Sequence, residues 1–176
     1  MLPKLILAAT LGLAAQVLAA EPSAEEYHVK GAYLLNFAKF VDWPEQVFKS
    51  PGDPIVLCIA GQNPFGPGLE RAAKDTVVAS RSVSVREVSD PQQASQCQIL
   101  FVSSAERKRA RTLLQALQTT SVLTVGEWDG FIASGGVINF KVEDEKVRIE
   151  INTASAERAK LRISAKLLSL AQAGKH

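Results

Sequence analysis

Residues 55–60 read Ile-Val-Leu-Cys-Ile-Ala, and this continuous apolar run decides the fold. A second apolar run, Gln-Ile-Leu-Phe-Val, occupies residues 98–102. Short apolar runs without polar alternation are typical of strands that are covered on both faces, as in a parallel sheet. We therefore predict that both runs are central strands of one sheet.

Helical and strand patterns alternate along the rest of the chain. The expected helices cover residues 24–41, 69–74, 103–117, 128–133 and 152–171, and the other expected strands cover residues 82–88, 122–125, 137–140 and 146–151. This alternation predicts an α/β fold with a single, mostly parallel sheet flanked by helices. The polar run of residues 143–145 suits the tip of an antiparallel hairpin between the last two strands.

Polar residues mark the start of three expected helices. Ser23 and Ser103 are each followed, three residues later, by a glutamate, which is a capping-box pattern. Asn152 suits the first position of the last helix. Residues 159–163 within that helix alternate at period two, as a strand would, but Leu161, Ala165 and Leu168 keep a helical face. We therefore predict one continuous last helix.

The composition limits the class of protein. The chain has 176 residues, of which 47% are hydrophobic and 22% are charged, and its formal net charge is +2. These values are typical of a globular chain of about one domain. Charges of both signs are mixed along the chain, so we expect no nucleic-acid partner. Two cysteines exclude a disulfide-dense scaffold, and with only His28 and His176 beside them they cannot form a classical four-ligand zinc finger.

The N-terminal residues 1–20 are typical of a secretory signal peptide. Lys4 precedes an apolar stretch, residues 5–18, that is too short and too broken to span about 30 Å of hydrocarbon. Val17 and Ala19 suit the −3 and −1 positions of a cleavage site. Cleavage one residue later is an alternative, as is an uncleaved N-terminal anchor.

The expected signal peptide, residues 1–20, determines the expected compartment. We predict that residues 21–176 form the mature domain and that the protein is exported. The leader resembles bacterial signals, so we place the mature protein in the periplasm. No later stretch is apolar enough to span a bilayer.

Two cysteines stand close to the two central runs. Cys58 lies inside the first run and Cys97 directly precedes the second. If the two runs are neighbouring strands, their spacing of about 4.8 Å is compatible with the Cα separation of about 4.4–6.8 Å in a disulfide. An oxidising compartment favours the bond, and two buried free thiols are the alternative. The Cys-x-x-Cys pattern of redox catalysts is absent.

Few motifs carry chemistry. Residues 66–71, Gly-Pro-Gly-Leu-Glu-Arg, begin like a dinucleotide-binding loop, but Arg71 stands where the third glycine is needed and Pro67 lacks an amide proton. A turn is the better interpretation. His28 beside Glu25 and Glu26 suits a solvated helix face better than a metal site. No hydrolase, metalloprotease or nucleotide-loop motif is present, so we expect no cofactor, no metal and no enzymatic activity.

Other side chains leave two interpretations open. Arg107, Lys108, Arg109 and Arg111 could contact anionic headgroups or peptidoglycan, or form a solvated helix face. Trp43 and Trp128 are predicted core anchors, although tryptophan is also enriched in protein interfaces.

A series of segments resembles the YfiR family of periplasmic proteins. The resemblance begins with residues 30–44, KGAYLLNFAKFVDWP, and continues in order through residues 57–61, 63–66, 80–86, 97–102, 123–127, 135–140, 147–152 and 161–168. It implies an α/β regulator rather than an enzyme, and it implies that Cys58 and Cys97 are a disulfide pair of the family. Some members carry a second cysteine pair near their C-terminal strands, which this chain lacks.

The resemblance also implies partners. A YfiR-like protein represses an inner-membrane diguanylate cyclase by binding the periplasmic region of that enzyme, which lowers the output of cyclic di-GMP. A peptidoglycan-associated outer-membrane lipoprotein is a further implied partner, and homodimers are expected. Biofilm formation should then depend on this protein.

Contact residues and an alternative function follow from the expected elements. Ile149, Ile163 and Leu167 are candidate partner-contact residues, as apolar positions expected to face outward on the last helix and the strand before it.

The alternative to a repressor of a cyclase is a periplasmic small-ligand sensor or solute-binding domain, with a site in the loops of residues 61–68, 103–104 and 126–127 at the carboxyl ends of the strands. A secreted enzyme is disfavoured because the catalytic set is missing.

Overall fold

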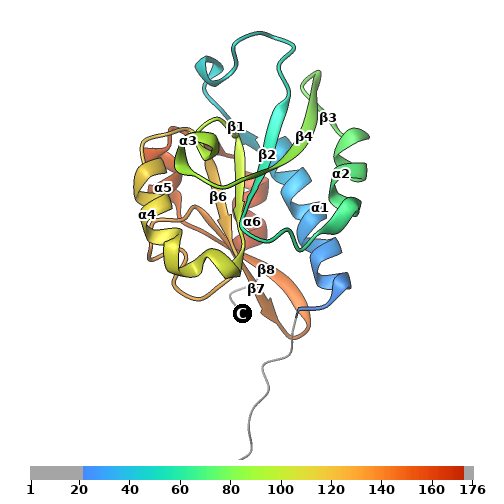
Figure 1. Ribbon diagram of the computed structural model, residues 1–176, viewed down its shortest axis with the longest axis vertical. Coiled ribbons are helices and arrows are strands. Elements are labelled where there is room, and N and C mark those ends of the chain that lie inside the picture. Colours follow the sequence, from blue (N-terminus) through green and yellow to red (C-terminus); the bar gives the residue numbers. More distant parts are fainter. Residues whose placement is uncertain (1–21, 173–176) are drawn as a thin grey trace, which may run out of the picture.

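The sheet at the centre of the protein has seven strands within residues 22–172, which are the residues that the computed structural model describes (Figure 1). The expected signal peptide and its cleavage site lie outside this range. No helix among the described residues is long and apolar enough to cross a membrane.

The strand order confirms the predicted mostly parallel sheet. Across the sheet the strands are β3 (Val77–Val78), β4 (Arg81–Val88), β2 (Ile55–Ala60), β5 (Ile99–Val102), β6 (Leu123–Gly126), β7 (Ile138–Glu143) and β8 (Lys146–Ile151). The five inner strands are parallel to one another. The two outer strands, β3 and β8, run antiparallel, and β7 and β8 form the expected hairpin.

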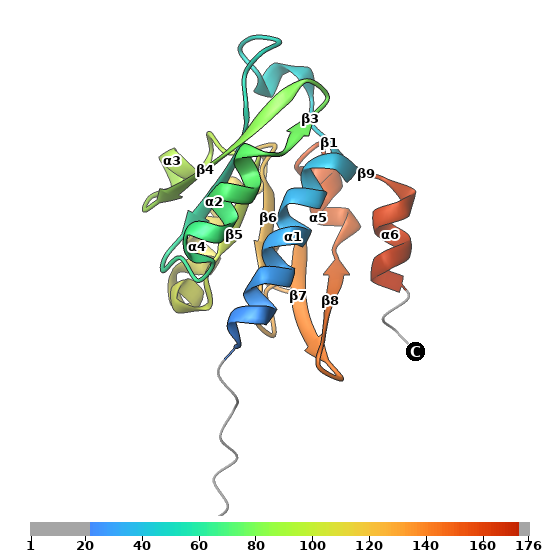
Figure 2. The same ribbon diagram turned by 90° about the vertical axis from the view of Figure 1, so that its right-hand side faces the viewer.

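Helices cover both faces of the sheet. They are α1 (Ala24–Phe40), α2 (Gly66–Lys74), α3 (Pro91–Ala94), α4 (Arg107–Leu117), α5 (Thr153–Arg158) and α6 (Ala165–Gln172), with short 3-10 turns η1 (Glu45–Val47) and η2 (Ser104–Glu106). Figure 2 shows α1 and α2 crossing one face of the sheet. The first turn of α1 and the tip of the β7–β8 hairpin lie at the same end of the molecule (Figures 1 and 2).

The apolar strands supply two separate core clusters. Leu57 and Ile59 of β2 belong to the cluster beneath α1, α2, α5 and α6. Cys58 and Ala60 belong to the cluster beneath α3 and α4. Successive side chains of a strand point to opposite faces, so a strand buried on both faces must be apolar throughout. This is why residues 55–60 show no alternation.

The predicted helix caps are largely confirmed. The Ser23 hydroxyl accepts a hydrogen bond from the Glu26 backbone N–H at 3.1 Å, and the Asn152 side chain accepts one from Ser155 N–H at 3.0 Å. Ser103 caps in the same way, through Ala105 N–H at 3.4 Å. The turn it opens is η2, and α4 follows directly.

The prediction of one continuous last helix is wrong. Helix α5 ends at Arg158, and Lys160 adopts a left-handed conformation with φ of 57°. Residues Arg162–Ile163 then form β9, which pairs antiparallel with β1 (Val41–Asp42). The period-two alternation of residues 159–163 was therefore the correct signal, and tertiary pairing with β1 decided the conformation.

The predicted helix at residues 128–133 is also wrong. The segment forms successive turns, in which Ser134 N–H bonds to the Gly130 carbonyl oxygen at 2.9 Å. Gly130 and Gly135 have φ of 91° and 100°, outside the helical range. These turns fold over Phe131, which is fully buried.

The turn of the β7–β8 hairpin offers a first prediction. Asp144 and Glu145 have φ of 49° and 60°, the left-handed conformations of a type I′ turn, in which Asn-Gly is favoured. Changing Asp144→Asn together with Glu145→Gly should stabilise the protein by about 1 kcal/mol, because glycine has no Cβ to disfavour the left-handed conformation and asparagine adopts it more readily than most residues. Urea unfolding measures the change. An unchanged or lower free energy of unfolding would count against the assigned turn.

Candidate functional site: a groove between α1 and the β7–β8 hairpin

A groove of about 1440 Å³ lies between the N-terminal half of α1, the β7–β8 hairpin and the segments that follow β5 and β6. Its lining combines charged side chains with Val29, Tyr33, Phe140, Val142 and Val147. Strands β5, β6 and β7 are parallel, so their carboxyl ends meet at this end of the sheet. Ligand sites in open α/β sheets are found at such an end.

The floor of the groove holds a buried cation between two carboxylates. Lys30 Nζ lies 2.8 Å from Glu127 Oε2 and 2.5 Å from Glu26 Oε1. The side chains of Lys30 and Glu127 are only 4% and 3% exposed. A buried charge is costly unless it is paired and hydrogen-bonded, so these residues depend on one another.

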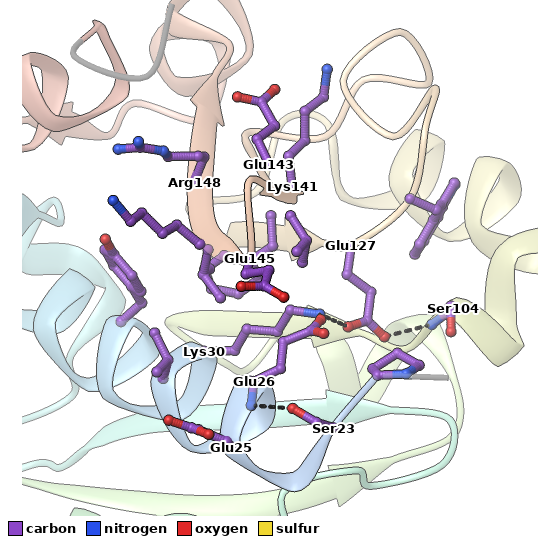
Figure 3. Close-up of a pocket in the computed structure, with 18 of the residues that line it drawn as sticks. Ser23, Glu25, Glu26, Lys30, Ser104, Glu127, Lys141, Glu143, Glu145 and Arg148 are labelled. Atoms are coloured by element: carbon purple, nitrogen blue, oxygen red, sulfur yellow. Dashed lines mark hydrogen bonds and ion pairs between the residues drawn. The ribbon is translucent and has the colours of Figure 1, made fainter. Parts of the chain in front are cut away.

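Glu127 connects three elements through its carboxylate. Besides Lys30, it accepts hydrogen bonds from Tyr27 Oη and from the Ser104 backbone N–H, both at 3.3 Å. Lys30 Nζ also lies 4.7 Å from the centroid of the Tyr27 ring, within range of a cation–π contact. Figure 3 shows Glu26, Lys30 and Glu127 pointing toward one another, with Ser104 beside Glu127. The carboxylate thereby ties α1 to the segments after β5 and β6.

Apolar side chains form the two sides of the groove. Val29 on α1 and Val142 on β7 are 37% and 52% exposed and rank among the exposed large apolar side chains of the described residues. Beneath them, Tyr33 and Phe140 pack with ring centroids 6.0 Å apart. Apolar surface that stays open next to charged residues is typical of an interaction site.

The outer side of the hairpin carries a separate ion pair. Lys141 Nζ lies 2.9 Å from Glu150 Oε1 on the neighbouring strand. The hydrogen bond to Glu150 raises the pKa of Lys141 above its usual value. Lys141 and Glu143 point away from the Glu26–Lys30–Glu127 cluster (Figure 3). This pair therefore strengthens the hairpin rather than the groove floor.

The structure brings together part of the site expected at the carboxyl ends of the strands. Ser104 and Glu127 both line the groove. Gly61, in the loop after β2, instead packs against Glu106, whose Cγ would lie 2.6 Å from an added Cβ. Glu106 thus fills the space between the loops after β2 and β5.

The expected outward placement is wrong for two of the three candidate contact residues. Ile149 and Leu167 are buried in the core beneath α1 and α6. Ile149 points to the same face of β8 as Val147 and Ile151, opposite to Arg148 and Glu150. Ile163 is half-buried on β9, so part of its side chain is open.

Sequence reasoning missed Lys30 as a site residue. A signal was present, because Lys30 stands four residues after Glu26, on the side of α1 that also carries Leu34 and Phe37. A lysine among apolar positions at helical spacing predicts a buried cation with a carboxylate partner. The partner Glu127 is 97 residues away and could not be identified from spacing.

The other singled-out residues are placed as follows. His28 and the basic residues Arg107, Lys108, Arg109 and Arg111 are exposed on their helices, and Gly66-Pro67-Gly68 forms the first turn of α2. Within residues 22–172, no cluster of histidine, cysteine or acidic residues is suited to a metal ion. Trp43 and Trp128 are half-buried and pack against the two core clusters.

A disulfide joins Cys58 to Cys97, in agreement with the expected pairing. Their Cα atoms are 6.0 Å apart, and both side chains are buried beneath α3 and α4. The bond lies on the opposite face of the sheet from α1. It is therefore separate from the groove.

A comparison with known families gives one match. The model of the family described as YfiR/HmsC-like matches residues 27–172, which include most of the groove and both cysteines. No curated protein matches the chain.

Proposed function

The chain belongs to the YfiR/HmsC-like family, and from this premise we propose that it represses an inner-membrane diguanylate cyclase by binding the periplasmic region of that enzyme. At the family level, membership supports a periplasmic regulator of a diguanylate cyclase and not an enzyme. Repression requires that the protein bind the inactive state of the cyclase more tightly than the active state. Lower cyclic di-GMP output follows from that difference in affinity.

We propose the groove between α1 and the hairpin as the surface that binds the cyclase. The observation that carries this proposal is the pair of open apolar side chains, Val29 and Val142, which line one groove from two separate elements. The ion pairs of Lys30 hold the α1 side in place, so little ordering is needed on binding. Ile163 remains a candidate contact outside this groove.

Further features of the proposal come from the leader and the family. Residues 1–20 act as a signal peptide, residues 21–176 form the mature periplasmic domain, and that domain forms a homodimer. A peptidoglycan-associated outer-membrane lipoprotein is the partner that relieves repression. Export places the domain in an oxidising compartment, where the disulfide persists.

A small-ligand sensor is the second candidate function. It is favoured by the meeting of Ser104 and Glu127 at the carboxyl end of the sheet. The volume of about 1440 Å³ exceeds the roughly 300–1,000 Å³ of small-molecule pockets. The groove is thus better suited to a protein surface, and we rank this function second.

Deletion and complementation test the proposed function. Deleting the gene should raise cellular cyclic di-GMP and biofilm, and the wild-type gene should restore both. Val142→Glu should fail to restore them, because it places a charge on the apolar side of the groove. Loss of folding would not explain this failure, because a substitution at an exposed position changes the free energy of unfolding by only about 0.5 kcal/mol. Cyclic di-GMP is measured by mass spectrometry of cell extracts.

Val77→Glu is the matched control. Val77 is also an exposed valine on a strand, 65% exposed, but β3 lies at the opposite edge of the sheet. This variant should complement like the wild type. Unchanged cyclic di-GMP on deletion would reject the cyclase as the target, and full complementation by Val142→Glu would reject the groove.

A further inference from the structure

One buried donor of the β7–β8 hairpin has no acceptor. Arg148 Nε, on β8, is buried and forms no hydrogen bond with any of the described residues. None of the salt bridges in that part of the chain includes Arg148. A buried polar group without a partner is costly, and more so when it belongs to a charged side chain. The free protein therefore carries an unsatisfied group at this position.

The carboxylates of the hairpin do not pair with Arg148. The residue directly opposite Arg148 on β7 is a second cation, Lys141. Lys141 Nζ lies 2.9 Å from Glu150 Oε1, and the other oxygen of Glu150 accepts a hydrogen bond from Asn139 Nδ2 at 3.4 Å. Figure 3 shows Arg148 pointing away from Glu143. Within residues 22–172, the charge of Arg148 is thus left without a carboxylate.

Arg148 belongs to the surface around the groove. It lines the same groove as the open apolar side chains Val29 and Val142. Val142 is paired with Val147, so both point to one side of the hairpin, and Arg148 points to the other side. Strand β8 is the last strand of the sheet. A partner that covers Val142 and extends around the hairpin would therefore also reach Arg148.

We propose that Arg148 recognises the partner by binding a carboxylate side chain in the periplasmic region of the cyclase. The guanidinium group can donate two parallel hydrogen bonds to the two oxygens of a carboxylate, which fixes orientation as well as adding attraction. Such a contact satisfies the buried Nε–H and compensates the charge. Arginine is enriched among the residues that dominate binding at interfaces. This inference rests on the proposed function, because it takes the cyclase as the partner.

The stability of the free protein gives the first test. Arg148→Met keeps an apolar stem and removes the unpaired charge, so it should raise the midpoint of thermal unfolding by about 2–4 °C. Arg111→Met is the matched control, because Arg111 on α4 is in no salt bridge of the described residues but is exposed. It should shift the midpoint by less than about 1 °C. An unchanged or lower midpoint for Arg148→Met would overturn the inference, because Arg148 would then be satisfied in the free protein.

Repression in cells gives the second test. In the deletion strain, Arg148→Met should leave cyclic di-GMP as high as an empty plasmid does, at equal amounts of periplasmic protein on an immunoblot. Arg111→Met should restore the wild-type level. Full repression by Arg148→Met would overturn the inference alone. Unchanged cyclic di-GMP on deletion would instead reject the proposed function and, with it, the cyclase as the source of the carboxylate.

Charge reversal tests the partner group directly. Arg148→Glu should fail to repress the cyclase. Each aspartate and glutamate in the periplasmic region of the cyclase is then changed in turn to arginine, and one of these changes should restore repression by Arg148→Glu while weakening repression by the wild type. Equal restoration with Arg148→Met, or restoration by none of the changes, would overturn the inference, because no specific pair would then exist.

Discussion

Replacing Cys58 and Cys97 together by alanine should lower the free energy of unfolding by about 4 kcal/mol. The disulfide spans a sequence separation of 39 residues, and closing a loop of that size lowers the conformational entropy of the unfolded chain by an amount worth about 4 kcal/mol. The loss is a large fraction of the roughly 5–15 kcal/mol that stabilises a typical domain. Urea unfolding of the oxidised wild type and of the double variant measures the difference.

The reduced wild type is the control for this experiment. It lacks the crosslink but keeps both side chains, so its stability should lie close to that of the double alanine variant. Any further loss in the variant reports the space left in the core beneath α3 and α4, where both cysteines are buried. A double variant within about 1 kcal/mol of the oxidised wild type would show that the crosslink contributes little.

Changing Lys30→Met should destabilise the protein by about 3 kcal/mol. Methionine preserves much of the apolar stem but removes the cation between Glu26 and Glu127. Among the residues that the structure describes, the Glu127 carboxylate, 3% exposed, would then keep the neutral donors Tyr27 Oη and Ser104 N–H but no cation. An unpaired buried charge is far more costly than the absence of the whole pair. Urea unfolding at neutral pH measures this loss.

A double-mutant cycle separates the pair from the individual side chains. Lys30→Met combined with Glu127→Gln removes both charges and keeps a side-chain oxygen that can accept from Tyr27 and Ser104. This double variant should be more stable than Lys30→Met alone, so the two effects should not add. Lys39→Met, at an exposed position of the same helix, should change stability by no more than about 0.5 kcal/mol. Equal effects of Lys30→Met and Lys39→Met would contradict the buried network.

Local pattern was sufficient for most of the sheet. The apolar runs at residues 55–60 and 98–102 became β2 and β5. The two strands are hydrogen-bonded neighbours, which is the condition on which the proposed geometry of the disulfide depended. The signal is strong because a strand buried on both faces requires apolar residues at every position. Ser23 and Asn152 were identified for a similar reason, since a cap depends on a residue three positions away at most.

Prediction failed where a distant partner determined the conformation. The pairing of β9 with β1 joins residues more than 100 positions apart and breaks the expected last helix. Ile149 and Leu167 are apolar positions that suit a core and an interface equally well, so their burial depended on where α1 and α6 pack. The turns at residues 128–133 required the fold to bury Phe131 beneath them.

The sequence by itself determined the α/β class, the positions of the main strands and the caps, because each rests on the type and spacing of residues close to one element. Only the tertiary structure decided that Lys30 meets Glu127 and that Val29 and Val142 line one groove. These contacts join residues from separate elements. Their free energy depends on distance in space, which residue spacing along the chain does not specify.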